Sequence, residues 1–254
     1  MLSLLQKGIL YSLEYKSQTA LIVTAIIITA ATVIIPYLLG SINSAMVVSR
    51  IFFGKDIRNE GSGNAGTTNV MRCYGKKAAL LTLLGDMLKT VVAILVGGLL
   101  MGLYYDKFAF SIGYGGYIAG FFCIVGHIWP IYYGFRGGKG VLCLATMVGV
   151  LTPLTLLPLL LIFILIVAFT KYVSLGSVVG GLLYPLLINR MLVFFLGKQL
   201  DGIQTVITIL AALLIVYCHR TNLSRIMNGK ENKFSFHSKK DKECADAAIK
   251  ETDE

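Results

Sequence analysis

The sequence predicts an all-helical integral membrane protein with about seven transmembrane helices. Hydrophobic residues make up 56% of its 254 residues and charged residues only 14%, whereas a soluble domain carries about a quarter charged residues. The mean hydropathy is +0.76. Apolar runs such as 21–39, 154–170 and 203–217 approach the roughly 20 residues that a helix needs to cross a bilayer. Lipid is therefore the expected solvent of most of the chain.

Seven apolar segments are expected to span the membrane, and some of them are short. They cover about 20–40, 78–104, 113–133, 141–152, 154–170, 177–196 and 203–219. The region 141–170 is too short for two full spans of about 20 residues each. A single long helix is the alternative, and it would move the C-terminus to the other side. A turn at Thr152-Pro153 is favoured, because the residue before a proline leaves the helical region and proline suits a helix start.

Basic residues indicate the orientation. With the N-terminus outside, most of the 23 Lys and Arg residues fall in the inside loops and the C-terminal tail, as the positive-inside rule requires. We therefore expect an outside N-terminus and a cytoplasmic C-terminus. The net charge of +10 is attributed to anionic headgroups and phosphorylated ligands rather than to nucleic acid.

The chain divides into one membrane domain and two flanking segments. Residues 1–19 form an N-terminal extension without a convincing cleavage site. The membrane domain covers 20–229, and 230–254 form a charged tail that its composition predicts to be disordered. Five scattered cysteines show no metal-ligand or disulfide spacing.

The first polar motif, GSGNAGTTNVMR at 61–72, is typical of a phosphate-binding loop. Its glycines allow sharp turns, and their amides could converge on an anion. Arg72 adds a planar fork suited to phosphate. Small polar donors fill the rest of the motif, namely Ser62, Asn64, Thr67, Thr68 and Asn69. An interfacial loop that is polar only for solvation is the alternative.

The second motif, GHIWPIYYGFRGGKG at 126–140, presents Lys139 between glycines at the start of a helix. A helix N-terminus itself favours anions. Trp129 and Tyr132 are expected to be interfacial anchors. His127 is either an acid–base group or, more simply, a hydrogen-bonded histidine near a span end.

Two shorter motifs follow on the same predicted side. KYVSLGS at 171–177 contains Ser177, and HRTNLSR at 219–225 contains His219 and Asn222 within one helical turn. Inside a predicted span, Asp86 and Lys89 lie three residues apart, which favours mutual pairing over a functional role. The four loops supply no Ser-His-Asp relay and no metal-ligand set, so neither a cofactor nor a metal is expected.

These four motifs closely resemble, in the same order, those of the bacterial acyl-phosphate:glycerol-3-phosphate acyltransferases, the PlsY family. The resemblance runs from about 36 to 233. It implies a bacterial plasma (inner) membrane enzyme with seven helices and an active site facing the cytoplasm. Such enzymes transfer a fatty acyl group from acyl phosphate to glycerol 3-phosphate. This makes lysophosphatidic acid and phosphate in the first committed step of phospholipid synthesis.

The resemblance also implies residue roles. Catalysis is expected from Lys139, Arg72 and His219. Substrate binding is expected from Ser62, Asn64, Ser177, Asn222, Gly61, Gly63 and Gly138. Lys139 would neutralise charge as the acyl–phosphate bond breaks, while the general base is either the phosphate of glycerol 3-phosphate or His219. The pair Leu142-Cys143 departs from the Ala-Thr of many relatives.

The implied partners are acyl phosphate, glycerol 3-phosphate, membrane lipid and an upstream enzyme that forms acyl phosphate. A membrane transporter of a phosphorylated metabolite is the alternative function, although its binding groups would be expected near the midplane and on both sides. A metal-dependent lipid-phosphate alcohol transferase would need a cluster of aspartates. The histidine-then-aspartate pair of related soluble acyltransferases does not occur at the required offset of five residues.

Overall fold

The computed structural model describes residues 18–103, 108–197 and 199–234, and this part of the chain is helical without β-strands. The predicted extension, apart from its last two residues, and the tail beyond 234 lie outside it. The α-helices are α2 (Gln18–Ser41), α3 (Ser44–Phe53), α4 (Thr67–Gly102), α5 (Phe108–Ile128), α6 (Val141–Leu151), α7 (Pro153–Thr170), α8 (Val173–Leu196), α9 (Gly202–Cys218) and α10 (Arg220–Met227). Two 3-10 turns, η1 (Ile57–Asn59) and η2 (Ile131–Tyr133), lie in the connecting loops.

The predicted spans correspond to helices α2, α4, α5, α6, α7, α8 and α9. Five described stretches are long and apolar enough to cross a bilayer, and the bent pair of α9 and α10 makes a sixth. Helix α6 has 11 residues, about 16 Å, or half of a 30 Å hydrocarbon core. Thr152 separates α6 from α7 with φ −145° and ψ 66°, which confirms the predicted turn and excludes a single long helix.

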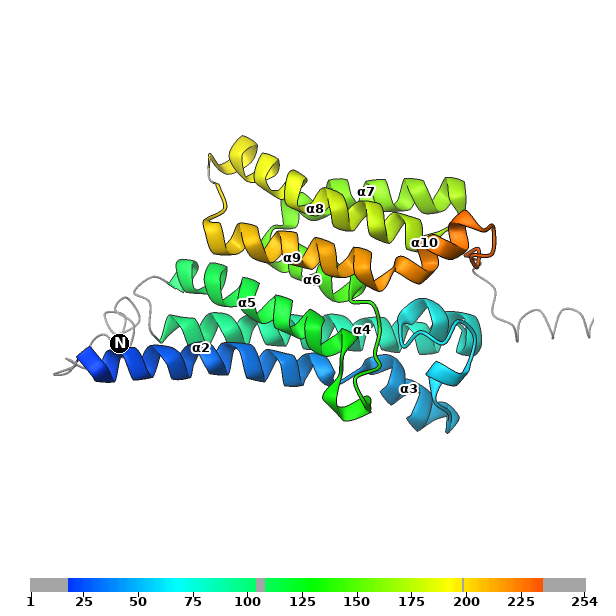
Figure 1. The fold of residues 1–254 in the computed structure, drawn as a ribbon, viewed down its shortest axis with the longest axis horizontal. Coiled ribbons are helices and arrows are strands. Elements are labelled where there is room, and N and C mark those ends of the chain that lie inside the picture. The colour runs from blue at the N-terminus through cyan, green and yellow to red at the C-terminus, as the bar shows by residue number, and fades with distance from the viewer. Residues whose placement is uncertain (1–17, 104–107, 198, 235–254) are drawn as a thin grey trace, which may run out of the picture.

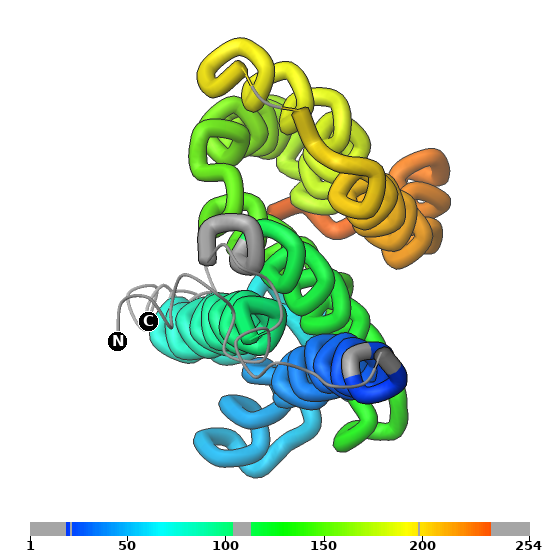
Figure 2. The backbone as a smooth tube through the Cα atoms, turned by 90° about the vertical axis from the view of Figure 1, so that its left-hand side faces the viewer, coloured from blue at the N-terminus to red at the C-terminus, as the bar shows by residue number. Residues whose placement is uncertain are grey.

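The helices form two groups that are joined by α6 and by a contact between α5 and α9. Helices α2, α4 and α5 pack together, as do α7, α8 and α9, while α6 contacts α4, α5 and α7. Figure 2 views the helices end-on and shows the two groups one above the other. In Figure 1 helix α2 begins at one end of the bundle, while α3, α10 and the four motif loops lie towards the opposite end.

Helix α3 is an element that the sequence analysis missed. Asn43 begins it by accepting a hydrogen bond from the Met46 amide at 3.1 Å, and its side-chain amide donates to the Ala65 carbonyl at 3.3 Å. Ile51 and Phe52 are exposed, as expected for residues that face lipid. Helix α3 has only ten residues and carries Arg50 in its last turn. It is too short for a span signal, so this stretch was predicted only as loop.

The predicted pair of Asp86 and Lys89 is confirmed, and it also fixes the end of α2. The Lys89 Nζ lies 2.8 Å from Asp86 Oδ1 and donates to the carbonyls of Gly40 and Ile42 at 3.1 and 2.9 Å. His127 completes the cluster, with its Nδ1 2.9 Å from Lys89 Nζ and 3.6 Å from Asp86 Oδ1. A buried charge is tolerated when it is paired and hydrogen-bonded, so this cluster holds α2, α4 and α5 together.

Candidate functional site

A cavity of about 490 Å³ lies between the two helix groups. One end of it is polar and draws side chains from all four sequence motifs. These are Ser62, Asn64, Arg72, Lys139, Ser177, His219 and Asn222. Thus every predicted site residue other than glycine reaches one cavity, although the motifs lie up to 160 positions apart in the chain.

The first motif is half loop and half helix, rather than the loop that was predicted. Helix α4 begins at Thr67, and a non-helical residue at Gly75 separates this polar start from the apolar span. Arg72 therefore lies near the N-terminus of a helix, where anions are favoured. Arg72 lines the cavity, and in the described part of the chain its guanidinium makes no hydrogen bond or ion pair.

Asn69 shapes the loop instead of serving only as a donor to a ligand. It is 1% exposed, its Oδ1 accepts from the Ser62 amide at 2.8 Å, and its Nδ2 donates to the Glu60 carbonyl at 2.9 Å. The amides of Gly63 and Gly66 also bond within the loop. The predicted nest of free glycine amides is therefore wrong for Gly63 and Gly66, and side chains supply the polar lining.

The three glycines predicted to bind substrate do not line the cavity; two of them permit close packing behind it. Gly61 has φ +59°, and a Cβ there would lie 2.3 Å from Asn69 Oδ1. A Cβ on Gly138 would lie 2.1 Å from His127 Nε2 and 2.8 Å from the Ala65 carbonyl oxygen. Gly138 thus lets the lysine loop lie against the first motif, while direct substrate contacts by Gly61, Gly63 and Gly138 stay a prediction.

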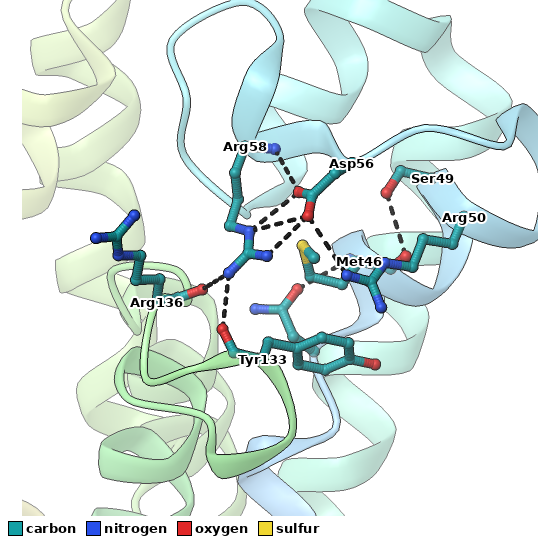
Figure 3. Close-up of polar contacts among 8 residues, drawn as sticks. Met46, Ser49, Arg50, Asp56, Arg58, Tyr133 and Arg136 are labelled. Carbon is teal, nitrogen blue, oxygen red and sulfur yellow. Dashed lines mark hydrogen bonds and ion pairs between the residues drawn. The ribbon is translucent and has the colours of Figure 1, made fainter.

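Arg58 connects the first two motif loops outside the cavity (Figure 3). Its Nη1 donates to the carbonyls of Tyr133 and Arg136 at 2.7 and 3.2 Å, and its Nη2 lies 2.7 Å from Asp56 Oδ2. The hydrogen bonds from Arg58 lower the pKa of Asp56 to about 2 against the opposing effect of burial. Arg50 approaches the same carboxylate only at 3.4 Å, with its own side chain 52% exposed.

Replacing Arg58 with alanine is expected to destabilise this junction by about 1–3 kcal/mol, because charged hydrogen bonds to two carbonyls and a carboxylate are lost. Thermal unfolding of the detergent-purified protein measures the effect. Arg50→Ala is the matched control and should change stability by less than about 0.5 kcal/mol, as exposed ion pairs do. Equal losses in the two variants would contradict the role given to Arg58.

Lys139 lies in the polar end of the cavity, just before α6, and its ammonium donates to Asn222 Oδ1. The pKa of Lys139 is lowered to about 8, mainly because the side chain is buried; Glu231 opposes this shift, and nearby Arg225 contributes to it. The ammonium is thus a partly desolvated cation, which attracts an anion more strongly than an exposed lysine does.

Glu231 is a site residue that the sequence analysis missed. Its carboxylate accepts from Asn222 Nδ2 at 2.6 Å, from Ser174 Oγ at 2.8 Å and from Arg225 Nε at 2.7 Å. Burial raises the pKa of Glu231, but these hydrogen bonds outweigh burial and lower it. Residues 230–234 therefore belong to the site end of the protein and not to the predicted tail. The only signal was a single acidic residue in the otherwise basic stretch 219–240.

His219 lies at the break between α9 and α10 and is 3% exposed. Its Nδ1 lies 2.8 Å from the Ile215 carbonyl oxygen, so a neutral ring donates there and keeps a lone pair on Nε2. The Ser177 hydroxyl donates to the Val173 carbonyl at 2.8 Å and can still accept a hydrogen bond. Both side chains line the cavity.

The other arm of the cavity is apolar. Its walls come from α6, α7, α8 and α9, through Leu144, Val148, Leu156, Leu159, Phe163, Tyr184 and Ile215. Leu160 also lines it but is 45% exposed, so this arm opens at the side of the bundle, where lipid is expected. The cavity as a whole suits a molecule with a phosphorylated head and an apolar chain.

Comparison with known proteins agrees with this geometry. The family model described as glycerol-3-phosphate acyltransferase matches residues 30–229. The glycerol-3-phosphate acyltransferase of Clostridioides difficile (strain 630) is 41% identical over 203 residues, 79% of this chain and 92% of that protein. That of Shouchella clausii (strain KSM-K16) is 42% identical over 211 residues, with 80% and 94% covered.

Two solved structures share the fold. The crystal structure of PlsY (YgiH), an integral membrane glycerol 3-phosphate acyltransferase, in its glycerol 3-phosphate form gives a TM-score of 0.68 at 32% identity, covering 82% of this chain and 96% of that one. Its lysophosphatidic acid form gives 0.65 at 30% identity with the same coverage. The chain described above is therefore an integral membrane protein that belongs to the PlsY family of glycerol-3-phosphate acyltransferases.

Proposed function

We propose that this protein transfers a fatty acyl group from acyl phosphate to glycerol 3-phosphate, giving lysophosphatidic acid and phosphate in the first committed step of phospholipid synthesis. The observation that carries the proposal is one continuous cavity. Its polar end holds Arg72, Lys139, His219 and Asn222, and its apolar arm opens at the side of the bundle. A lipid-like anionic donor and a small phosphorylated acceptor fit the two regions.

In the proposed reaction, a hydroxyl oxygen of glycerol 3-phosphate forms a bond to the carbonyl carbon of the donor. The bond from that carbon to the phosphate oxygen breaks, and phosphate leaves with the electron pair. Arg72 and Lys139 neutralise the two phosphates and the charge that grows on the leaving oxygen. Acyl phosphate is already activated, so positioning the substrates supplies much of the rate.

The hydroxyl proton needs an acceptor within hydrogen-bond reach. The phosphate of glycerol 3-phosphate is one candidate, as the family resemblance implies. Nε2 of His219 is the other, because its Nδ1 is occupied by the Ile215 carbonyl. In neither scheme does a metal take part. In the described residues, no three His, Cys, Asp or Glu side chains come together in a metal-binding group.

The proposed reaction takes place at the cytoplasmic face of the bacterial inner membrane. The basic loops support this placement by the positive-inside rule, and α2 begins at the end of the bundle opposite to the site. The proposal also requires an upstream enzyme that forms acyl phosphate. A transporter is less well supported, because the anion-binding side chains gather at one end of the described helices.

The direct test is to give the purified protein palmitoyl phosphate and glycerol 3-phosphate, and to measure both phosphate release and lysophosphatidic acid. We expect turnover with acyl phosphate and no turnover with acyl-CoA. The rate should be the same in the presence of a chelator. Flux of glycerol 3-phosphate into liposomes without turnover would instead support the transporter. Activity that is lost in chelator would contradict the metal-independent scheme.

The pH dependence follows from Lys139. Its pKa of about 8 means that the cation is present below this pH and is lost as the pH rises through it. We therefore expect kcat/KM, which reports the free enzyme, to fall above about pH 8. The arginine side chain of the Lys139→Arg variant stays charged, so its residual kcat/KM should not fall over this pH range. A fall at the same pH in both proteins would assign it to another group.

A further inference from the structure

One face of α8 connects the polar end of the cavity to its apolar arm. Ser177, Gly180, Gly181 and Tyr184 all line the cavity, and spacings of three, four and seven residues place them on the same side of a helix. A rise of 1.5 Å per residue puts Gly180 about 4.5 Å and Tyr184 about 10.5 Å beyond Ser177 along the axis. Tyr184 is 1% exposed, so it forms a fixed part of the wall.

Packing explains the neighbouring glycines but not Gly180. A Cβ on Gly176 would lie 2.9 Å from Phe163 Cδ2, and one on Gly181 would lie 3.1 Å from Ile215 Cγ2. A Cβ on Gly180 would meet no heavy atom within 4 Å, and the backbone there is ordinary right-handed helix. Glycine is also among the least favourable residues in a helix interior. Neither packing nor backbone geometry therefore requires glycine at this position.

The lack of a side chain at Gly180 leaves space along the cavity wall between the polar end and the apolar arm. We propose that Gly180 determines which acyl donors the protein accepts, by leaving room beside α8 for a long linear acyl chain. This inference rests on the proposed function. The occupant is the chain of the donor, because the arm is lined by Leu159, Phe163 and Ile215 and joins the anion-binding end without a break.

The test is a series of increasing size, Gly180→Ala, Gly180→Leu and Gly180→Phe, assayed with palmitoyl phosphate and with butyryl phosphate. A butyryl chain is too short to extend far past position 180. Differences of one methylene in an apolar pocket change kcat/KM by roughly 10–200-fold, so Leu and Phe should lower it for palmitoyl phosphate at least about tenfold. For butyryl phosphate, kcat/KM should stay within about twofold of the parent value. Gly180→Ala should give a palmitoyl-to-butyryl ratio of kcat/KM between that of the parent and that of Gly180→Leu.

Leu182→Phe is the matched control, since it adds bulk to the same helix at a side chain that is 48% exposed and does not line the cavity. It should leave the ratio of kcat/KM for the two donors unchanged. Unfolding temperatures show whether each variant folds, and the Ala variant should be at least as stable as the parent because it favours the helix.

Equal losses for both donors, or no change in the palmitoyl rate across the series, would overturn the role of Gly180 while leaving acyl transfer intact. A parent protein that is inactive with both acyl phosphates would overturn the proposed function and this inference with it.

Discussion

Replacing Lys139 with alanine is expected to lower kcat for acyl transfer by about 10²–10³-fold, the usual effect of removing one group that stabilises developing charge. The ammonium is half-buried at the polar end of the cavity and is held by Asn222. In the proposed reaction, negative charge grows on the leaving oxygen as the acyl–phosphate bond breaks, and water cannot screen it as well there as in bulk. Steady-state phosphate release with saturating substrates measures the change.

The control for this variant is Lys77→Ala, which removes the same charge from an exposed position on α4 that does not line the cavity. It should retain kcat within about twofold, as surface substitutions generally do little. A Lys139→Ala protein that turns over as fast as the Lys77→Ala protein would show that the lysine does not act on the transition state.

The second large effect is expected from Arg72→Ala, which should lower kcat/KM by about 10²-fold, because a planar pair of charge-assisted hydrogen bonds to phosphate is lost. Arg72 is suited to this because it lines the cavity without a partner in the described residues. Arg72→Lys should recover only part of the loss, since lysine restores the charge but not the fork. Separate KM values for the two substrates will show which phosphate it binds.

Arg136→Ala controls for the lost positive charge, because Arg136 belongs to the second motif, is exposed and does not line the cavity. It should leave both KM values nearly unchanged. If a protein lacking both Arg72 and Lys139 side chains still transferred acyl groups, the assigned site itself would be wrong.

Much of the fold could be predicted because lipid imposes simple rules on a sequence. Runs of apolar residues located α2, α7 and α9, and Thr152-Pro153 located the turn between α6 and α7. Alternation of the spans then placed the four motifs at one end. No knowledge of side-chain packing was needed for these steps, since length, hydropathy and the backbone preferences of proline determine them.

The remaining features depend on contacts between distant segments. Asn69 could be recognised as polar, but its role in bonding Ser62 and Glu60 follows from the loop geometry. Glu231 could not be separated from a solvated tail, because its partners Ser174, Asn222 and Arg225 meet it only in the folded protein. Helix α3 was missed for a different reason, since its ten residues are too few to give a span signal.

The side opening at Leu160 places the site at the boundary between two solvents. In the proposed reaction, a donor with a long chain arrives by diffusion within the plane of the bilayer, whereas glycerol 3-phosphate arrives from water at the end of the bundle. The KM for the donor is consequently a mole fraction in the membrane, whereas the KM for the acceptor is a concentration in bulk water. The lysophosphatidic acid formed can return to the bilayer through the same opening without ever exposing its chain to water.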